Sequence, residues 1–189
     1  RVDAVPMSVA LITAADFQAA RQGLGVDEAL NQVPGVFFQN RYNFAQNLRI
    51  STRGFGARSP FGIRGIRILN DGFPETLPDG QAQIDTIDYL SLVNAEIIKG
   101  PSAVLYGNAS GGVIAFETND GRGQTPGVEL RLDYGSDGFE RTSLQAGGDW
   151  DEWHGWLSVS SLDFDGQRRQ SATNKRLLNA HTGFDWGEH

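Results

Sequence analysis

The chain has 189 residues, enough for one or two small domains, and a formal net charge of −7 at pH 7. It has no cysteine, which excludes disulfides and cysteine-ligated metal sites, and its 24 glycines exceed the usual share of about 7%. No apolar run approaches the roughly 18 residues of a membrane-spanning helix.

The first 120 residues predict short helices and short strands. A strand is expected over residues 7–12, followed by a helix that Thr13 caps, with Asp16 three residues on. A second short helix begins near Asp27 and ends before Pro34 and Gly35. Glycine or proline ends the further strands expected over residues 48–55, 65–74, 95–101 and 111–118, and a short helix is expected over 101–106.

The pattern changes after a turn-rich linker over residues 119–127, where about four strands of roughly ten residues follow. In the first of them, Val128, Leu130, Leu132 and Tyr134 share one face. Such alternation is typical both of an antiparallel sheet with one wet face and of a membrane β-barrel. Three of the four tryptophans, at 150, 153 and 156, cluster near one turn, where a membrane barrel has an aromatic girdle.

Arginine and glycine gather in the first half of the chain. Residues 29–70 contain six arginines and no acidic residue, although the whole chain is acidic. This basic stretch has three interpretations. It could bind nucleic acid, it could be a solvated basic face, or its guanidinium groups could pair with carboxylates elsewhere in the protein. The overall acidity and the lack of a recognition helix argue against nucleic acid. The interspersed glycines, which permit sharp turns and close backbone approach, favour paired guanidinium groups.

Catalytic and metal-binding patterns are weak. The three histidines do not have the spacing of metal ligands, and no nucleophile–base arrangement or carboxylate pair stands out. We therefore expect neither an enzyme nor a resident cofactor.

Three segments, in this order, resemble the plug domain of TonB-dependent outer-membrane receptors: "ALNQVPGV", "STRGFGARSPFGIRGIRILNDGFP" and "EIIKGPSAVLYGNASGGVIAFET". The resemblance covers about residues 5–118. It implies an α+β plug domain with a mixed sheet and short helices over residues 1–120. Residues 121–189 would then begin a 22-stranded transmembrane β-barrel in the outer membrane of a Gram-negative bacterium. Four strands cannot close a barrel, so a fragment is expected. Lys99 stands where the family usually has arginine.

The resemblance also implies a function and its residues. The receptor would bind a ferric chelate, such as a siderophore or ferric citrate, and move it into the periplasm. Its partners would be the TonB energy-coupling protein and outer-membrane lipid, although no TonB box is visible and no nucleic acid is expected. Arg53, Arg64 and Arg67 would lock the plug to barrel glutamates.

The expected ligand residues come from two loops. "DGQAQ" resembles a stretch of ferric-citrate-type receptors in which Gln81 and Gln83 would reach the chelate. Five further ligand residues are expected only because they lie in an outward-facing loop: Gln39, Asn40, Arg41, Tyr42 and Asn43. Two alternatives stay open: a receptor of this family for a non-iron cargo such as cobalamin or sugars, and a soluble α+β ligand-binding module with an appended β-meander.

Overall fold

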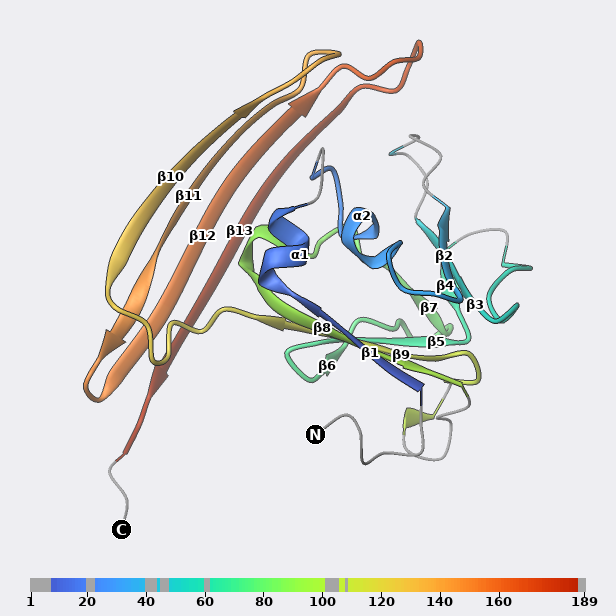
Figure 1. Ribbon diagram of the computed structural model, residues 1–189, viewed down its shortest axis with the longest axis horizontal. Coiled ribbons are helices and arrows are strands. Elements are labelled where there is room, and N and C mark those ends of the chain that lie inside the picture. Colours follow the sequence, from blue (N-terminus) through green and yellow to red (C-terminus); the bar gives the residue numbers. More distant parts are fainter. Residues whose placement is uncertain are drawn as a thin grey trace. The chain divides into compact units, whose positions relative to one another are not determined.

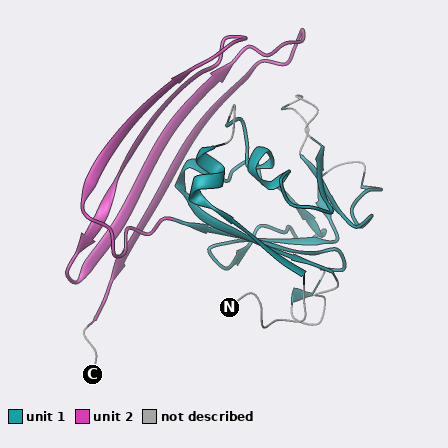
Figure 2. Cartoon of the chain, in the orientation of Figure 1, with its two compact units in different colours: residues 1–118 teal, residues 119–189 magenta. Residues whose placement is uncertain are grey.

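The computed structural model describes residues 8–19, 23–39, 44, 48–59, 62–100, 106–107 and 109–186. The chain forms two compact units, residues 1–118 and residues 119–189, which Figure 2 shows in different colours. No helix among the described residues is long and apolar enough to cross a membrane.

A five-stranded mixed sheet forms the base of the first unit (Figure 1). Its strands, in spatial order, are β1 (Ser8–Thr13), β8 (Leu92–Lys99), β9 (Gly112–Thr118), β5 (Ile66–Asn70) and β6 (Phe73–Pro74). The pairing of β5 with β9 is parallel and the other pairings are antiparallel. The mixed sheet confirms the expected fold class.

Two small strand pairs complete the first unit. They are β2 (Val36–Gln39) with β3 (Arg49–Thr52), and β4 (Ile63–Arg64) with β7 (Gln81–Ala82). The strand expected over residues 65–74 is instead a hairpin of β5 and β6, because Asp71 and Gly72 have φ values of 49° and 80° and turn the chain. Gly65, with φ 73°, separates β4 from β5.

The two expected ligand loops also contain strands, which corrects the prediction. Gln39 is the last residue of β2, where Val36 and Phe38 are buried and Phe37 is exposed. Gln81 is the first residue of β7. Both strands are too short for alternation to show clearly in the sequence.

The helices of the first unit are α1 (Ala14–Gln18), α2 (Asp27–Leu30) and a 3₁₀ turn over Tyr89–Ser91. The predicted cap of α1 is confirmed: the Thr13 N–H and hydroxyl each donate to the Asp16 carboxylate at 2.8 Å. These bonds, the backbone N–H first, lower the pKa of Asp16 from its ordinary 3.8. The helix expected over residues 101–106 lies outside the described residues, apart from Tyr106.

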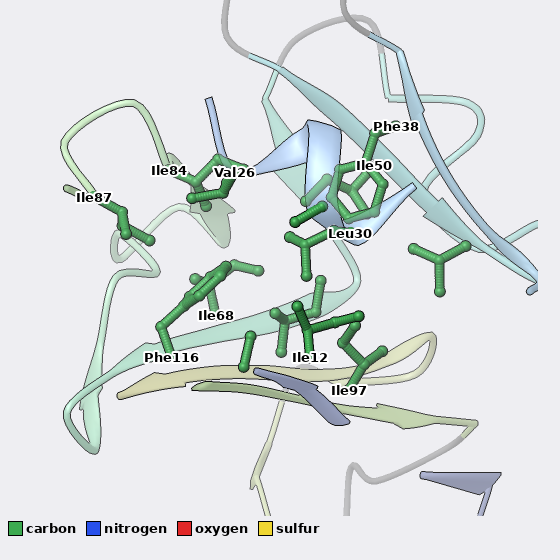
Figure 3. Close-up of a cluster of buried hydrophobic side chains, with 14 of the residues drawn as sticks. Ile12, Val26, Leu30, Phe38, Ile50, Ile68, Ile84, Ile87, Ile97 and Phe116 are labelled. Atoms are coloured by element: carbon green, nitrogen blue, oxygen red, sulfur yellow. The ribbon is translucent and has the colours of Figure 1, made fainter. Parts of the chain in front are cut away.

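The main core lies between the sheet and the helices (Figure 3). Ile68, Ile97 and Phe116 come from the sheet, while Leu30 comes from α2 and Ile50 from β3. All five side chains are at most 1% exposed. Burial of these apolar side chains is the main favourable term that holds the first unit together.

The second unit is a four-stranded antiparallel meander in chain order, as expected. Its strands are β10 (Gly127–Tyr134), β11 (Glu140–Trp150), β12 (Trp153–Phe164) and β13 (Thr173–Phe184). One exposed apolar row crosses all four strands, made by Leu130, Leu144, Val159 and Leu178. On the same face, Trp150, Trp153 and Phe184 form an aromatic row, and the Trp153 and Phe184 ring centroids are 4.8 Å apart.

The opposite face of the meander is polar. Asp133 accepts hydrogen bonds from Arg131 Nε at 3.0 Å and from Arg141 Nη2 at 2.7 Å. The Arg141 side chain is 5% exposed and its guanidinium lies 5.3 Å from the centroid of the Phe139 ring. Trp156 is also on this face, because it is one residue out of phase with Trp153 and Leu157, and it therefore does not join the aromatic row.

Candidate ligand-binding site

The arginine-glycine stretch begins with a tight hairpin turn. The Thr52 N–H donates to the Phe55 carbonyl at 3.0 Å, and the Phe55 N–H donates back to Thr52 at 2.8 Å. The two central residues, Arg53 and Gly54, have φ values of 47° and 88°, as in a type I′ turn. Arg53 therefore lies at the tip of the turn, with its side chain exposed.

Two of the recognised motifs meet at this turn. The Thr52 hydroxyl donates to the Gly111 carbonyl at 2.6 Å, and the Gly111 N–H donates to the Gly65 carbonyl at 2.7 Å. A Cβ at Gly111 would lie 2.7 Å from Phe55 Cβ, and one at Gly56 would lie 2.5 Å from the Ile50 carbonyl oxygen. Contacts this close explain why "RGFG" and "SGGVI" need glycine.

A further contact joins two other motifs. Lys99 Nζ donates to the Pro34 carbonyl at 3.3 Å, so the "KGP" segment is linked to "LNQVPGV". Lysine can make this single bond although it lacks the forked donors of arginine.

An open cavity of about 540 Å³ lies beside the turn. Its lining comes from the turn, from β4 and from β7, and consists of Gly54, Phe55, Gly56, Arg58, Ser59, Arg64, Gly65 and Gln81. The cavity thus lies within the first unit and is built largely from the arginine-glycine stretch.

Hydrogen-bond donors line part of the cavity. Arg64 and Gln81 are directly paired across β4 and β7. The backbone of Gln81 is held by Asp79, whose Oδ1 accepts its N–H at 3.0 Å, and by Leu77, whose N–H donates to its carbonyl at 2.7 Å. The Arg64 guanidinium is 3.9 Å from Asp79 Oδ2, beyond hydrogen-bond length. Two guanidinium groups and an amide suit an anionic or oxygen-rich ligand.

The predicted ligand residues are only partly brought together. Gln81 lines the cavity, and Gln83 is exposed nearby in sequence but does not line it. Gln39 is exposed at the end of β2. The predicted residues 40–43, which are Asn40, Arg41, Tyr42 and Asn43, lie outside the described residues.

The three predicted lock arginines have different environments. Arg53 is at the tip of the turn, Arg64 lines the cavity, and Arg67 is half-buried in β5 opposite Val113. Sequence reasoning missed Arg58, Ser59 and Phe55 as cavity residues. Their place in the acid-free arginine-glycine stretch was the signal that could have identified them.

Comparison with known proteins decides the family. Residues 1–113 match the family model of the TonB-dependent receptor plug domain. The chain belongs to this family. A hemin receptor of Yersinia enterocolitica is 30% identical over 147 residues, which are 76% of this chain and 19% of the receptor. The ferrichrome outer membrane transporter/phage receptor of Escherichia coli K12 is 27% identical over 76% of this chain and 18% of its own length.

Solved receptors share the fold. The ferric yersiniabactin uptake receptor FyuA of Yersinia pestis superposes with a TM-score of 0.69 at 23% identity, over 86% of this chain and 25% of FyuA. The chain spans about a fifth to a quarter of the length of these relatives. Family membership confirms the plug fold and the Gram-negative outer-membrane location, and it favours the receptor over the alternative of a soluble module.

Proposed function

We propose that this TonB-dependent receptor binds a ferric chelate and transports it into the periplasm with energy delivered through TonB. The match of residues 1–113 to the plug family is the observation that carries the proposal. The curated relatives are receptors for hemin and ferrichrome, both of which are iron chelates. Binding and release, rather than bond chemistry, would be the work of such a receptor, and iron would enter only as chelated cargo.

The cavity supplies suitable chemistry for such a cargo. Ferric chelates present oxygen atoms and often negative charge, to which the donors of Arg58, Arg64 and Gln81 are complementary. We propose that Gln81 contacts the chelate inside the cavity and that Gln83 contacts it from the adjoining surface. By the same proposal, Gln39, Asn40, Arg41, Tyr42 and Asn43 form a second contact segment.

The proposed lock shares Arg64 with the cavity. Arg53 and Arg64 have exposed side chains in the first unit, and Arg67 is half-buried. Because Asp79 is 3.9 Å from Arg64, the Arg64 guanidinium keeps donors for another carboxylate. We propose that these arginines pair with acidic residues of the barrel, a polar contact that can loosen without exposing apolar surface.

Uptake and binding by cells that carry the full-length receptor test the proposal. Cells given a panel of radiolabelled ferric chelates should accumulate at least one of them, and loss of TonB should abolish accumulation. The double variant Gln81→Ala, Gln83→Ala should weaken binding of that chelate about tenfold, because two amide donors are lost.

Gln32→Ala, an exposed glutamine after α2, is the matched control and should leave binding unchanged. Equal binding curves for the parent and the double variant would remove the cavity as the ligand site. Uptake of cobalamin or a sugar, with no uptake of any ferric chelate, would favour the non-iron alternative.

A further inference from the structure

The segment that connects β9 to β10 is folded on itself. It comprises residues 119–126, a polar stretch with two glycines and one proline that is typical of a turn-rich linker. Asn119 Oδ1 accepts from Gln124 Nε2 and from the Gly121 N–H, both at 2.9 Å, while Asn119 Nδ2 donates to Gln124 Oε1 at 3.3 Å. The Gln124 N–H donates to the Gly121 carbonyl at 3.3 Å. The two amide side chains therefore close the segment into a loop.

Two hydrogen bonds attach this loop to β11. The Asp149 N–H donates to the Gln124 carbonyl at 2.9 Å, and the Gly123 N–H donates to Asp149 Oδ2 at 2.7 Å. Both bonds hold the 119–126 segment at the end of β11 next to the β11–β12 turn.

Arg122 attaches the loop to two further strands. Its Nη2 donates to Asp185 Oδ1 at 2.8 Å, just beyond the end of β13, and lies 3.5 Å from Nε2 of His154 in β12. The His154 side chain is 2% exposed, and its Nδ1 lies 3.5 Å from Asp185 Oδ2. Both ring nitrogens of His154 therefore lie near the Arg122–Asp185 ion pair.

The segment also lies against strand backbone at distances that admit no side chain. Gly121 has φ 83°, and a Cβ there would lie 2.2 Å from the Gly155 carbonyl oxygen and 2.9 Å from that of Gly148. A Cβ at Gly148 would in turn lie 2.4 Å from Pro126 Cα. Glycines on both surfaces thus permit the close contact.

On the other side of the boundary, the last residue of the first unit is also fixed. The Thr118 N–H and hydroxyl donate to the two oxygens of the Asp71 carboxylate, each at 2.7 Å. The chain is therefore held by hydrogen bonds on both sides of the peptide that joins Thr118 to Asn119.

We propose that residues 119–126 are a docked segment that stays bound to β11, β12 and β13, rather than a flexible tether. Arg122 positions the segment within the second unit. This inference does not depend on the cargo or on transport.

Trypsin tests the proposal, because the Arg122–Gly123 bond is a trypsin site inside the segment. In the full-length receptor purified in detergent, cleavage after Arg122 should be at least about tenfold slower than cleavage after Arg169, an exposed arginine in the β12–β13 loop. Similar rates at the two sites would overturn the proposal.

A pair of glycine variants isolates the backbone contact. Gly121→Ala should raise the cleavage rate after Arg122 about tenfold, because its Cβ cannot fit against Gly155. Gly127→Ala is the control, because a Cβ at Gly127 would meet only the Thr125 carbonyl oxygen, at an ordinary contact distance of 3.8 Å. Equal rates for these two variants would contradict the docked arrangement.

Asp185→Asn tests the side-chain contact and keeps the test valid if Gly121→Ala fails to assemble. It should raise cleavage about threefold, a modest change because Arg122 and Asp185 are 57% and 48% exposed. Asp151→Asn, in the exposed β11–β12 turn, is its control and should leave the rate unchanged. If neither Gly121→Ala nor Asp185→Asn raises the rate of cleavage after Arg122, the proposal is overturned.

Discussion

Gly56 shows how far the candidate site depends on the absence of a side chain. Its φ of 81° is unfavourable for other residues, and the Ile50 carbonyl oxygen occupies the space that a Cβ would need. Gly54, two residues earlier, has a similar φ of 88° and open space around it. An alanine at Gly54 would therefore meet backbone strain alone, whereas an alanine at Gly56 would meet both strain and a steric clash.

We expect Gly56→Ala to reduce the free energy of local opening over residues 49–59 by about 2–3 kcal/mol, since strain and clash both act. Gly54→Ala should cost about 1 kcal/mol, because only the strain applies. Hydrogen exchange of that segment in the full-length receptor measures both values. Equal exchange rates in the two variants would show that the Ile50 backbone shifts to make room for the new Cβ at little cost in free energy.

Asp16 gives the cap of α1 a defined pH dependence. Its pKa is lowered in the folded chain, so the ionised carboxylate stabilises the cap above the ordinary value of 3.8, and this contribution is lost as the pH falls through the lowered pKa. A spin label at the exposed position Gln18 should gain mobility only in that acidic range. The Asp16→Asn variant should not show the transition, and an unchanged transition in it would assign the effect to another group.

At the scale of elements, strand length decided what the sequence could predict. The four strands of the second unit have 8 to 12 residues, long enough for alternation to appear on two faces. β2, β6 and β7 have four residues or fewer, and β6 contains a proline, which is unfavourable inside strands. Their pairing is set by tertiary contacts that a local pattern does not contain.

The apolar row of the meander predicts a face-dependent effect of charge. Leu178 is 72% exposed in this row, and Asn179 is its neighbour on the opposite face of β13. Leu178→Arg should reduce barrel stability by about 2–4 kcal/mol if the row faces the hydrocarbon of the membrane, whereas Asn179→Arg should be tolerated. The heat-dependent gel shift of the folded receptor measures assembly, and equal assembly of both variants would show that the row does not face lipid.

At the scale of the whole molecule, the candidate site brings together residues that are distant in the sequence. Arg64 and Gln81 meet because β4 pairs with β7, although β5 and β6 lie between these two strands in the sequence. The Thr52 hydroxyl donates to the Gly111 carbonyl across 59 residues of sequence. The motifs made the plug fold predictable. The cavity was not predictable, because no local pattern specifies which strands pair.

The proposed lock predicts a transport defect without an assembly defect. Arg53→Glu and Arg64→Glu should each lower chelate uptake roughly tenfold, because a like charge would face the proposed carboxylate partners, while the barrel still assembles. Arg169→Glu, in the exposed β12–β13 loop, is the control and should transport normally. Normal uptake in both plug variants would reject the lock.

The two margins of the five-stranded sheet differ in what they can accept. On one margin, β6 has only two residues, and Pro74 has no N–H to donate. The N–H of the next residue, Glu75, already donates a hydrogen bond to the Ile68 carbonyl at 3.1 Å. On the other margin β1 offers six residues, none of them proline. An extended peptide that pairs with this sheet through its main chain would therefore align along β1 rather than β6.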